Sequence, residues 1–232
     1  GLGFPNPSWH ECLACPVHNV NWYEAAAFCN ALSEKEQLEP CYDLSSCSGS
    51  IGGGCLAGDG LCGGDLPPDQ LYSCEDNPRL FDAYWECEGY RLPTVAEYEY
   101  TARAGTQTAT YLGDLPSNLA GCELFEAVDE GSWHCGVSDH PMPRALLTQN
   151  DWGLLDILGN VEEWTNTFYD GYTLGHGDQS LSNPQGVESS PLVWLKGGSF
   201  GSQSCKTRAA CGAGSSPEMR AGFAGFRPVR TL

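Results

Sequence analysis

The sequence predicts an α+β fold of two main helices, short strands and many loops, held together by disulfides. Glycine and proline account for 29 and 15 of the 232 residues, and long runs of periodic apolar residues are few. Two segments carry the start signals of helices. The 13 cysteines are more than a reducing cytosol tolerates outside metal sites, and they favour a disulfide-rich chain. A chain of this length can bury one sizeable core, so we expect a single domain over residues 1–232.

The first helix is predicted to begin after Asn21. In a capping box, the Asn21 side chain accepts from the amide of Glu24, and the Glu24 carboxylate reaches back to the amide of Asn21. An apolar face at helical spacing follows, and it predicts a helix that runs to about Glu36. The face comprises Trp22, Ala25, Ala26, Cys29 and Leu32.

The second helix is predicted from a repeat of the same device, with Thr94 as the cap and Glu97 as its partner. We expect this helix to stop at Gly105, because glycine readily adopts the left-handed conformation that closes a helix. The remaining elements are expected to be short strands, such as residues 193–196 and residues 226–229, joined by long loops.

The charge and the hydropathy of the chain argue against two kinds of partner. Against 30 acidic residues there are 11 basic ones, so the formal net charge is -19. Such a surface repels phosphate backbones and anionic lipid headgroups, and we expect no nucleic-acid partner. No stretch approaches the roughly 20 apolar residues that a membrane-spanning helix needs, so no membrane span is expected.

Residues 41–88 form a cysteine-rich segment that we interpret as an insertion on the surface of the domain. The segment is polar and has little apolar periodicity, so covalent links are its expected source of order. Sequence alone allows many pairings. We expect Cys41 to pair with Cys87, because the segments that flank the insertion must be brought together. The cysteines of the insertion are Cys41, Cys47, Cys55, Cys62, Cys74 and Cys87. The odd total of 13 leaves one thiol unpaired or paired outside this chain.

Residues 151–164 concentrate oxygen ligands that suit a hard cation. Two carboxylates, on Asp156 and Glu163, and main-chain carbonyls at Gly159 and Val161 fall within eight residues. Such ligands suit Ca2+. A Gly-Asn pair inside an apolar run also signals an ordinary tight turn with solvated acids. Spacing alone leaves both interpretations open.

The same stretch resembles the signature of the formylglycine-generating enzyme, or sulfatase-modifying factor, family. Its residues follow the pattern G-L-x-D-x-x-G-N-V-x-E-W. Further segments resemble family motifs in the family's order: residues 16–30, residues 90–100, and residues 196–200 closed by residues 225–227. The resemblance implies a C-type-lectin-like α+β fold stabilised by bound Ca2+. Family members carry several strands before the first motif, whereas only residues 1–15 precede it here, so we expect the domain to be N-terminally incomplete.

The resemblance also implies two sets of calcium ligands. The better matched set comprises Asp156, Gly159, Val161 and Glu163. The second set matches less well and comprises Asn118, Leu119, Glu130 and Ser132. If Glu163 is a ligand, its replacement by alanine is expected to lower thermal stability in calcium and to change little in EDTA.

The family's copper centre is a further implication, and here the sequence departs from the family. In the enzymes, two cysteines with four residues between them follow Gly-Gly-Ser, bind copper and oxidise a substrate cysteine to formylglycine with O2. Counted forward from Ser199, the first position falls on Ser202; counted back from the C-terminal motif, the second falls on Ser204. A serine hydroxyl is a poor ligand for Cu(I), so copper is not expected. Cys205 and Cys211 lie nearby at a different spacing. We expect them to form a disulfide or to be two half-cystines, and they are the remaining candidates for catalytic residues.

Histidines offer no clearer site. His134 and His140 flank Cys135 and Asp139 in one loop, an arrangement that would allow a metal cluster. Isolated histidines in a polar loop are more often ordinary surface side chains, and we expect that here.

Together these observations favour an exported, calcium-stabilised domain of this family that acts as a non-catalytic binding or structural module. The loop between Ser199 and Gly225 and the cysteine-rich insertion would present its surface to a protein or carbohydrate ligand. The disulfide framework indicates an oxidising compartment, so the domain is expected to be secreted, periplasmic or at the cell surface. Two alternatives stay open. One is a copper-dependent oxidase of the formylglycine-generating type with an altered site at Cys205 and Cys211. The other is a subunit of an extracellular assembly in which another chain completes the N-terminal strands.

Overall fold

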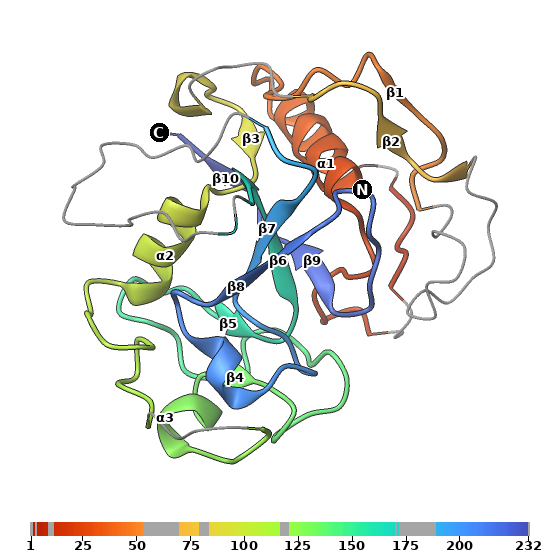
Figure 1. The fold of residues 1–232 in the computed structure, drawn as a ribbon. Helices are drawn as coiled ribbons and strands as arrows, with labels where there is room; N and C mark the ends of the chain where they lie inside the picture. The colour runs from red at the N-terminus through yellow and green to blue at the C-terminus, as the bar shows by residue number, and fades with distance from the viewer. Residues whose placement is uncertain are drawn as a thin grey trace.

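A four-stranded sheet lies at the centre of the computed structural model, which describes residues 2, 4–8, 12–52, 70–78, 84–116, 121–169, 171 and 189–231 (Figure 1). Its strands are β6 (Glu162–Phe168), β7 (Val193–Lys196), β8 (Gly212–Ser215) and β9 (Ala224–Phe226). The strand order is β8-β7-β6-β9. β7 runs antiparallel to both β6 and β8, whereas β6 and β9 run parallel. The parallel pair brings the signature segment beside the C-terminal motif.

Helix α1 (Trp22–Lys35) begins and ends close to its predicted positions. The Asn21 side chain accepts from the Glu24 amide, and the Glu24 carboxylate accepts from the Asn21 amide, both at 2.9 Å, so the predicted capping box is present. The helix buries its apolar face against the sheet, where Trp22 and Trp164 join one core cluster. The Trp22 indole also donates to a main-chain carbonyl of β6 at 2.7 Å.

Helix α2 (Val95–Arg103) has the second predicted capping box, formed by Thr94 and Glu97. The helix ends one residue earlier than predicted, because Ala104 itself adopts the left-handed conformation with φ 47°. Gly105 follows with φ 91°. Side chains of α2 belong to a second core cluster, which contains Tyr98, Ala102, Ile157, Leu158 and Ala209.

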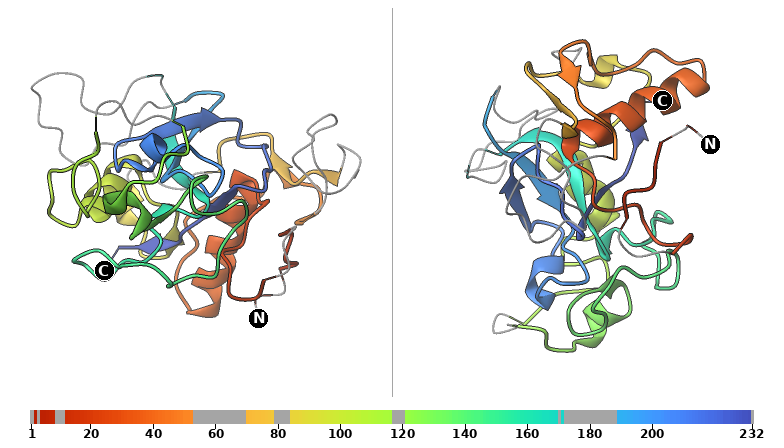
Figure 2. Two further views of the ribbon diagram at one scale, coloured as in Figure 1. Left: turned by 90° about the horizontal axis from the view of Figure 1, so that it is seen from below. Right: turned by 90° about the vertical axis from the view of Figure 1, so that its right-hand side faces the viewer.

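The remaining described elements are short, as predicted. The paired strands are β1 (Cys47–Ser48) with β2 (Ser73–Cys74), β3 (Tyr90–Arg91) with β10 (Val229–Arg230), and β4 (Ser132–Trp133) with β5 (Leu158–Gly159). The short helices are η2 (Tyr84–Glu86), α3 (Glu126–Asp129) and η3 (Ser204–Thr207). Figures 1 and 2 show α1 and α3 at opposite ends of the molecule. Among the described residues, no helix has the length and apolar character needed to cross a membrane.

The prediction of one continuous strand over residues 226–229 is wrong, because two separate strands lie there. β9 ends before Arg227, and β10 begins after Pro228. Proline has no amide hydrogen to donate to a sheet, and Arg227 turns its guanidinium towards Glu163. The strand predicted over residues 193–196 is confirmed as β7.

Disulfides join eight described cysteines, which confirms the expected disulfide-rich fold. The pairs are Cys12–Cys15, Cys41–Cys87, Cys47–Cys74 and Cys122–Cys135. The Cys41–Cys87 bridge is the predicted closure of the cysteine-rich insertion. Two further cysteines of the insertion, Cys55 and Cys62, lie outside the described residues.

The other described cysteines are thiols, so the predicted disulfide between Cys205 and Cys211 is wrong. Their surroundings differ, since Cys205 Sγ lies 3.8 Å from Gln203 Oε1, whereas Cys211 lies near Lys196. Burial lowers the pKa of Lys196, and Glu99 and then Cys211 oppose that shift. Cys29 is fully buried in α1, and this burial raises the pKa of its thiol. Cys29 therefore behaves as a small apolar core residue.

Candidate functional site

The better matched set of predicted calcium ligands lies on and beside the turn between β5 and β6. Asp156, Gly159 and Asn160 have positive φ angles of 53°, 80° and 65°. A Cβ atom on Gly159 would collide with the Ser132 hydroxyl, so this position requires glycine for space as well as for conformation. The Asn160 side chain accepts from the Met142 amide and donates to the Met142 carbonyl, both at 3.0 Å. These contacts fix the turn against a neighbouring loop.

Glu163 and Arg227 form an ion pair beneath this turn. Glu163 is 4% exposed, and the Arg227 guanidinium donates to both its carboxylate oxygens, with Nε–Oε2 at 3.0 Å and Nη2–Oε1 at 2.8 Å. Arg227 also donates to the main-chain carbonyls of Leu155 and Asp156, at 3.2 and 3.3 Å. Burial raises the pKa of Glu163 and the Arg227 charge opposes that rise, while the Glu163 charge raises the pKa of Arg227. The pair thus holds the signature turn to the C-terminal motif.

The two carboxylate oxygens of Asp156 differ in their hydrogen bonding. Its Oδ2 accepts from the Ala145 amide at 2.8 Å. Its Oδ1 is buried and has no hydrogen-bond partner within the described part of the chain. A pocket of about 440 Å³ opens at this point, and Asp156, Val161, Glu163 and Arg227 are among its lining residues. A buried carboxylate oxygen without a donor is energetically costly, and a cation in the pocket would relieve that cost.

The residues around this pocket fit a hard cation. Asp156 and Glu163, which line the pocket, would supply carboxylate oxygens. Val161, also a lining residue, and Gly159, which is not one, would supply main-chain carbonyls. An ionised carboxylate offers about four acceptor positions, so the bonds from Arg227 leave acceptor capacity on Glu163. No three His, Cys, Asp or Glu side chains gather as a metal cluster anywhere in the described ranges. A cation here would therefore depend on the main-chain carbonyls as well as on the two carboxylates.

The structure describes two of the four residues of the second predicted calcium set, Glu130 and Ser132. Asn118 and Leu119 lie outside the described residues. Glu130 is exposed, whereas Ser132 is 2% exposed and its Oγ has no hydrogen-bond partner among described atoms. Ser132 lies against Gly159 of the better matched set, because β4 and β5 run side by side.

Hydroxyl groups occupy the expected copper positions. Ser202 Oγ accepts from the Ser199 amide at 3.0 Å, lies 3.1 Å from the Ser199 hydroxyl, and donates to Glu162 Oε1 at 3.3 Å. Burial raises the pKa of Glu162. With four residues between the two positions, as in the family, the second position counted from Ser202 falls on Thr207, whereas counting back from the C-terminal motif leads to Ser204. Thr207 is fully buried, and its hydroxyl donates to the Ser204 carbonyl at 2.8 Å.

Ser204 belongs to a buried Ser-His-Asp chain that the sequence did not indicate. His134 Nε2 lies 2.8 Å from Asp129 Oδ1, and His134 Nδ1 lies 3.3 Å from Ser204 Oγ. However, the Gly136 amide donates to Nδ1 at 3.1 Å, and the Ser204 hydroxyl donates to the Glu123 carbonyl at 2.6 Å. Ser204 and His134 are both fully buried. The hydroxyl proton is already used and the oxygen is closed to substrate, so this chain is structural rather than nucleophilic. The expectation that His134 is a surface side chain is wrong, because its ring bridges α3 and η3.

Comparison with known proteins identifies the family of this domain. The family model described as "Sulfatase-modifying factor enzyme 1-like domain" matches residues 5–232. The chaperone protein LppX of Paenibacillus barcinonensis is 29% identical over 168 residues, covering 68% of this chain and 54% of LppX. The formylglycine-generating enzyme of Mus musculus is 30% identical over 153 residues, covering 62% of this chain and 40% of the enzyme. The inactive C-alpha-formylglycine-generating enzyme 2 of Bos taurus is 30% identical over 151 residues, covering 62% and 45%. The matches thus span about half the length of these relatives, or less.

Solved structures agree with the fold. Treponema denticola variable protein 1 superposes with a TM-score of 0.69 and is 28% identical, covering 98% of this chain and 78% of that protein. PvdO from Pseudomonas aeruginosa has a TM-score of 0.63 at 17% identity, covering 97% and 65%, which supports the shared fold alone. The predicted formylglycine-generating-enzyme fold, with its C-type-lectin-like α+β architecture, is confirmed.

Proposed function

Because the chain belongs to the sulfatase-modifying factor family, we propose that it is a non-catalytic binding module of that family, exported and stabilised by calcium. Its ligand would meet the loop between Ser199 and Gly225 and the cysteine-rich insertion, residues 41–88. The single observation that carries the proposal is the pair of hydroxyls at the copper positions. Copper-dependent oxidation needs two thiolates, and Ser202 and Thr207 have neither the affinity for Cu(I) nor the redox chemistry.

The names of the relatives support the view that members of this family can keep the fold without the formylglycine-generating activity. One relative of similar identity is named an inactive formylglycine-generating enzyme, and another is named a chaperone. The Treponema denticola protein is named a variable protein, and it matches nearly the whole of this chain. Function in such a case depends on the site rather than on the fold, and the site here lacks the catalytic thiols.

Export is supported by the disulfides. Eight described cysteines are paired in a chain of 232 residues, and disulfides persist in secreted, periplasmic and cell-surface proteins rather than in the cytosol. Calcium is supported by the buried, unbonded Oδ1 of Asp156 beside Glu163. A cation between these carboxylates would add electrostatic attraction where their charges otherwise repel.

A turnover assay tests the loss of catalysis. The purified protein would be loaded with Cu(I) and incubated with O2 and a cysteine-containing peptide, and mass spectrometry would measure conversion of the cysteine to the aldehyde. A family member with formylglycine-generating activity is the positive control. We expect no conversion by this chain under conditions in which the positive control converts the peptide. Copper-dependent turnover would refute the proposal.

One alternative function is favoured by a specific observation, since Cys205 and Cys211 are both thiols and both partly exposed. An oxidase with an altered copper site would use these two side chains. The assay therefore includes the Cys205→Ser and Cys211→Ser variants. Turnover by the wild-type chain that each variant abolishes would establish this alternative. Copper binding without turnover would leave the thiols as an adventitious soft-metal site.

A further inference from the structure

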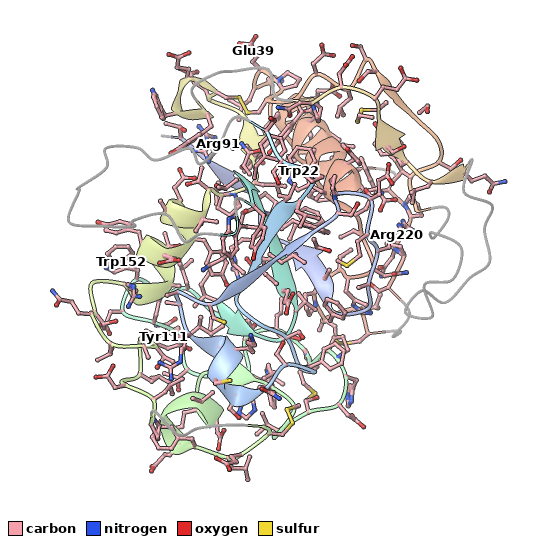
Figure 3. All side chains as sticks on the ribbon, in the orientation of Figure 1. Trp22, Glu39, Arg91, Tyr111, Trp152 and Arg220 are labelled. Carbon is pink, nitrogen blue, oxygen red and sulfur yellow. A yellow bond between two sulfur atoms is a disulfide. The ribbon has the colours of Figure 1, made fainter. Side chains whose placement is uncertain are left out.

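A second pocket, of about 440 Å³, opens where the cysteine-rich insertion meets the loop that follows β8. One wall is residues 74–78 of the insertion, and the facing wall is residues 216–218. Its floor includes Trp22, Tyr23 and Phe168. Figure 3 labels Trp22 beside α1 and the central sheet. We call this space the aromatic pocket. It is separate from the pocket beside Asp156 and Glu163, because the two share no lining residue.

Both walls of the aromatic pocket are held in place by the fold. The Cys47–Cys74 disulfide anchors the start of the insertion wall, and the Asp43 amide donates to the Pro78 carbonyl at its other end, at 2.5 Å. The Trp22 amide donates to the Pro217 carbonyl of the facing wall at 2.9 Å. The pocket is therefore formed before a ligand arrives, so binding costs less conformational entropy than it would with mobile walls.

Three aromatic residues, Trp22, Tyr23 and Phe168, line the pocket, and Trp22 is only 3% exposed. The Trp22 and Tyr23 rings are perpendicular, with an interplanar angle of 88° and centroids 5.6 Å apart. Tyr23 and Phe168 are only partly buried, so ring surface remains available to a ligand. The partly exposed rings of Tyr23 and Phe168 suit an organic cation, which is attracted to the negative face of an aromatic ring.

The charged residues among the described lining of the aromatic pocket are all acidic. Glu75, Asp76 and Glu218 line the pocket, and none of its described lining residues is basic. None of the three carboxylates forms a salt bridge with a described residue. Burial and then the Glu218 charge raise the pKa of Tyr23. By contrast, the buried carboxylate of Glu24 is paired with Arg220.

We propose that the aromatic pocket binds the cationic side chain of a lysine or arginine in an exposed segment of a protein partner. The rings would contact the alkyl stem and the charged group, and the carboxylates would neutralise the charge. A pocket of this size lies at the small end of the range for ligand sites, which suits one side chain with its immediate backbone neighbours. The inference rests on the proposed binding function, and it names the chemistry of the partner.

The test uses short peptides as probes. The peptide acetyl-Gly-Gly-Lys-Gly-Gly-amide would be titrated into the full chain, with arginine and norleucine peptides in parallel. Binding would be followed by NMR through the ring signals of Tyr23, assigned with the Tyr23→Phe variant. We expect the lysine and arginine peptides to shift these signals and the norleucine peptide, which lacks the charge, to bind at least tenfold more weakly, since the attraction is mainly electrostatic, by an order-of-magnitude estimate.

Charge variants locate the effect in the pocket. Glu218→Gln and Asp76→Asn each remove one charge at the pocket, and Glu34→Gln removes one charge from an exposed position of α1 as the matched control. The pocket variants should lower the affinity for the lysine peptide by about three- to tenfold, and the control should change that affinity by less than about twofold.

Several results would overturn the inference. They are equal binding of the norleucine peptide, an equal loss in Glu34→Gln, or no shift of the Tyr23 signals with any peptide. If a neutral sugar shifts the Tyr23 signals and the cationic peptides do not, the pocket binds a carbohydrate instead. None of these results depends on the copper assay, so failure of this inference is distinguishable from failure of the proposed loss of catalysis.

Discussion

Arg227 donates to both carboxylate oxygens of Glu163 and so joins two motifs that lie 64 residues apart in the chain. The contact gives Glu163 a structural role in addition to its predicted role as a calcium ligand. The simple expectation that Glu163→Ala is harmless in EDTA is therefore revised. Removal of this carboxylate leaves the Arg227 guanidinium beside the turn without its partner, so stability should fall with and without calcium.

Asp156 is the better position at which to test calcium. In Asp156→Asn, the amide oxygen can still accept from the Ala145 amide, and only the charge that would face the cation is lost. With calcium at about 100 times its Kd, linkage predicts about 2.7 kcal/mol of added stability for the wild type. We expect Asp156→Asn to lose most of this gain and to match the wild type in EDTA. Thermal denaturation in calcium and in EDTA measures both. A full calcium gain in the variant would exclude Asp156 as a ligand.

Glu24 should be among the least replaceable acids of the chain. Its carboxylate accepts from the Asn21 and Gly52 amides at 2.9 and 2.6 Å, and from the Arg220 guanidinium at 2.9 and 2.5 Å. Glu24 and Arg220 are each 3% exposed. Because Glu24→Gln removes one charge of a buried ion pair, we expect a loss of about 3–5 kcal/mol in the free energy of unfolding, measured by urea denaturation. The exposed Glu34→Gln is the control and should change stability by less than about 0.5 kcal/mol.

Glu97 should make stability depend on pH in the acid range. Burial alone raises the pKa of Glu97, but two hydrogen bonds from Arg91 at 2.8 Å, its charge, and the bonds from Thr94 outweigh burial and lower that pKa below 4.5. The unfolded chain therefore binds this proton more readily than the folded one. The stabilisation is fully present above the unfolded pKa and is lost as the pH falls through the folded pKa.

The variant Glu97→Gln isolates this contribution. We expect it to lower the melting temperature at pH 7 and to approach the wild type as the pH falls well below 4.5. Melting curves across that range measure the difference between the two proteins. A difference that stays constant with pH would show that the carboxylate charge of Glu97 does not contribute.

Cysteines introduced at the expected copper positions should raise the affinity of the protein for Cu(I). We expect the double variant Ser202→Cys and Thr207→Cys to bind Cu(I) with a higher affinity than the wild type, because two thiolates suit this soft ion. Each single variant should bind less tightly than the pair, and competition with a chromogenic Cu(I) chelator measures all of them. If the double variant binds no better than the wild type, Thr207 is not the equivalent of the second cysteine.

Local patterns predicted the features that depend on neighbours in the chain. Both capping boxes involve residues three positions apart, so Asn21 with Glu24 and Thr94 with Glu97 were identifiable from spacing alone. The pairing of Cys41 with Cys87 was also anticipated, because it closes an insertion whose limits the composition reveals. The ordered motifs specified the family, and the family specified the fold.

Only the tertiary structure decided the features that depend on distant segments. His134 lies in a polar loop of the sequence, yet its ring is buried between Asp129 and Ser204. The aromatic pocket likewise requires the insertion to meet the loop after β8.

The sequence by itself determined the helix starts, the disulfide-rich character and the absence of a cysteine pair with the family's spacing after Gly-Gly-Ser, because each depends on residue type and short spacing. The fold decided which charges are paired and which remain available to a ligand. Glu163 and Glu218 are both glutamates, but one lies against Arg227 and the other lines the aromatic pocket. That difference arises from packing between segments far apart in the chain, which no local pattern records.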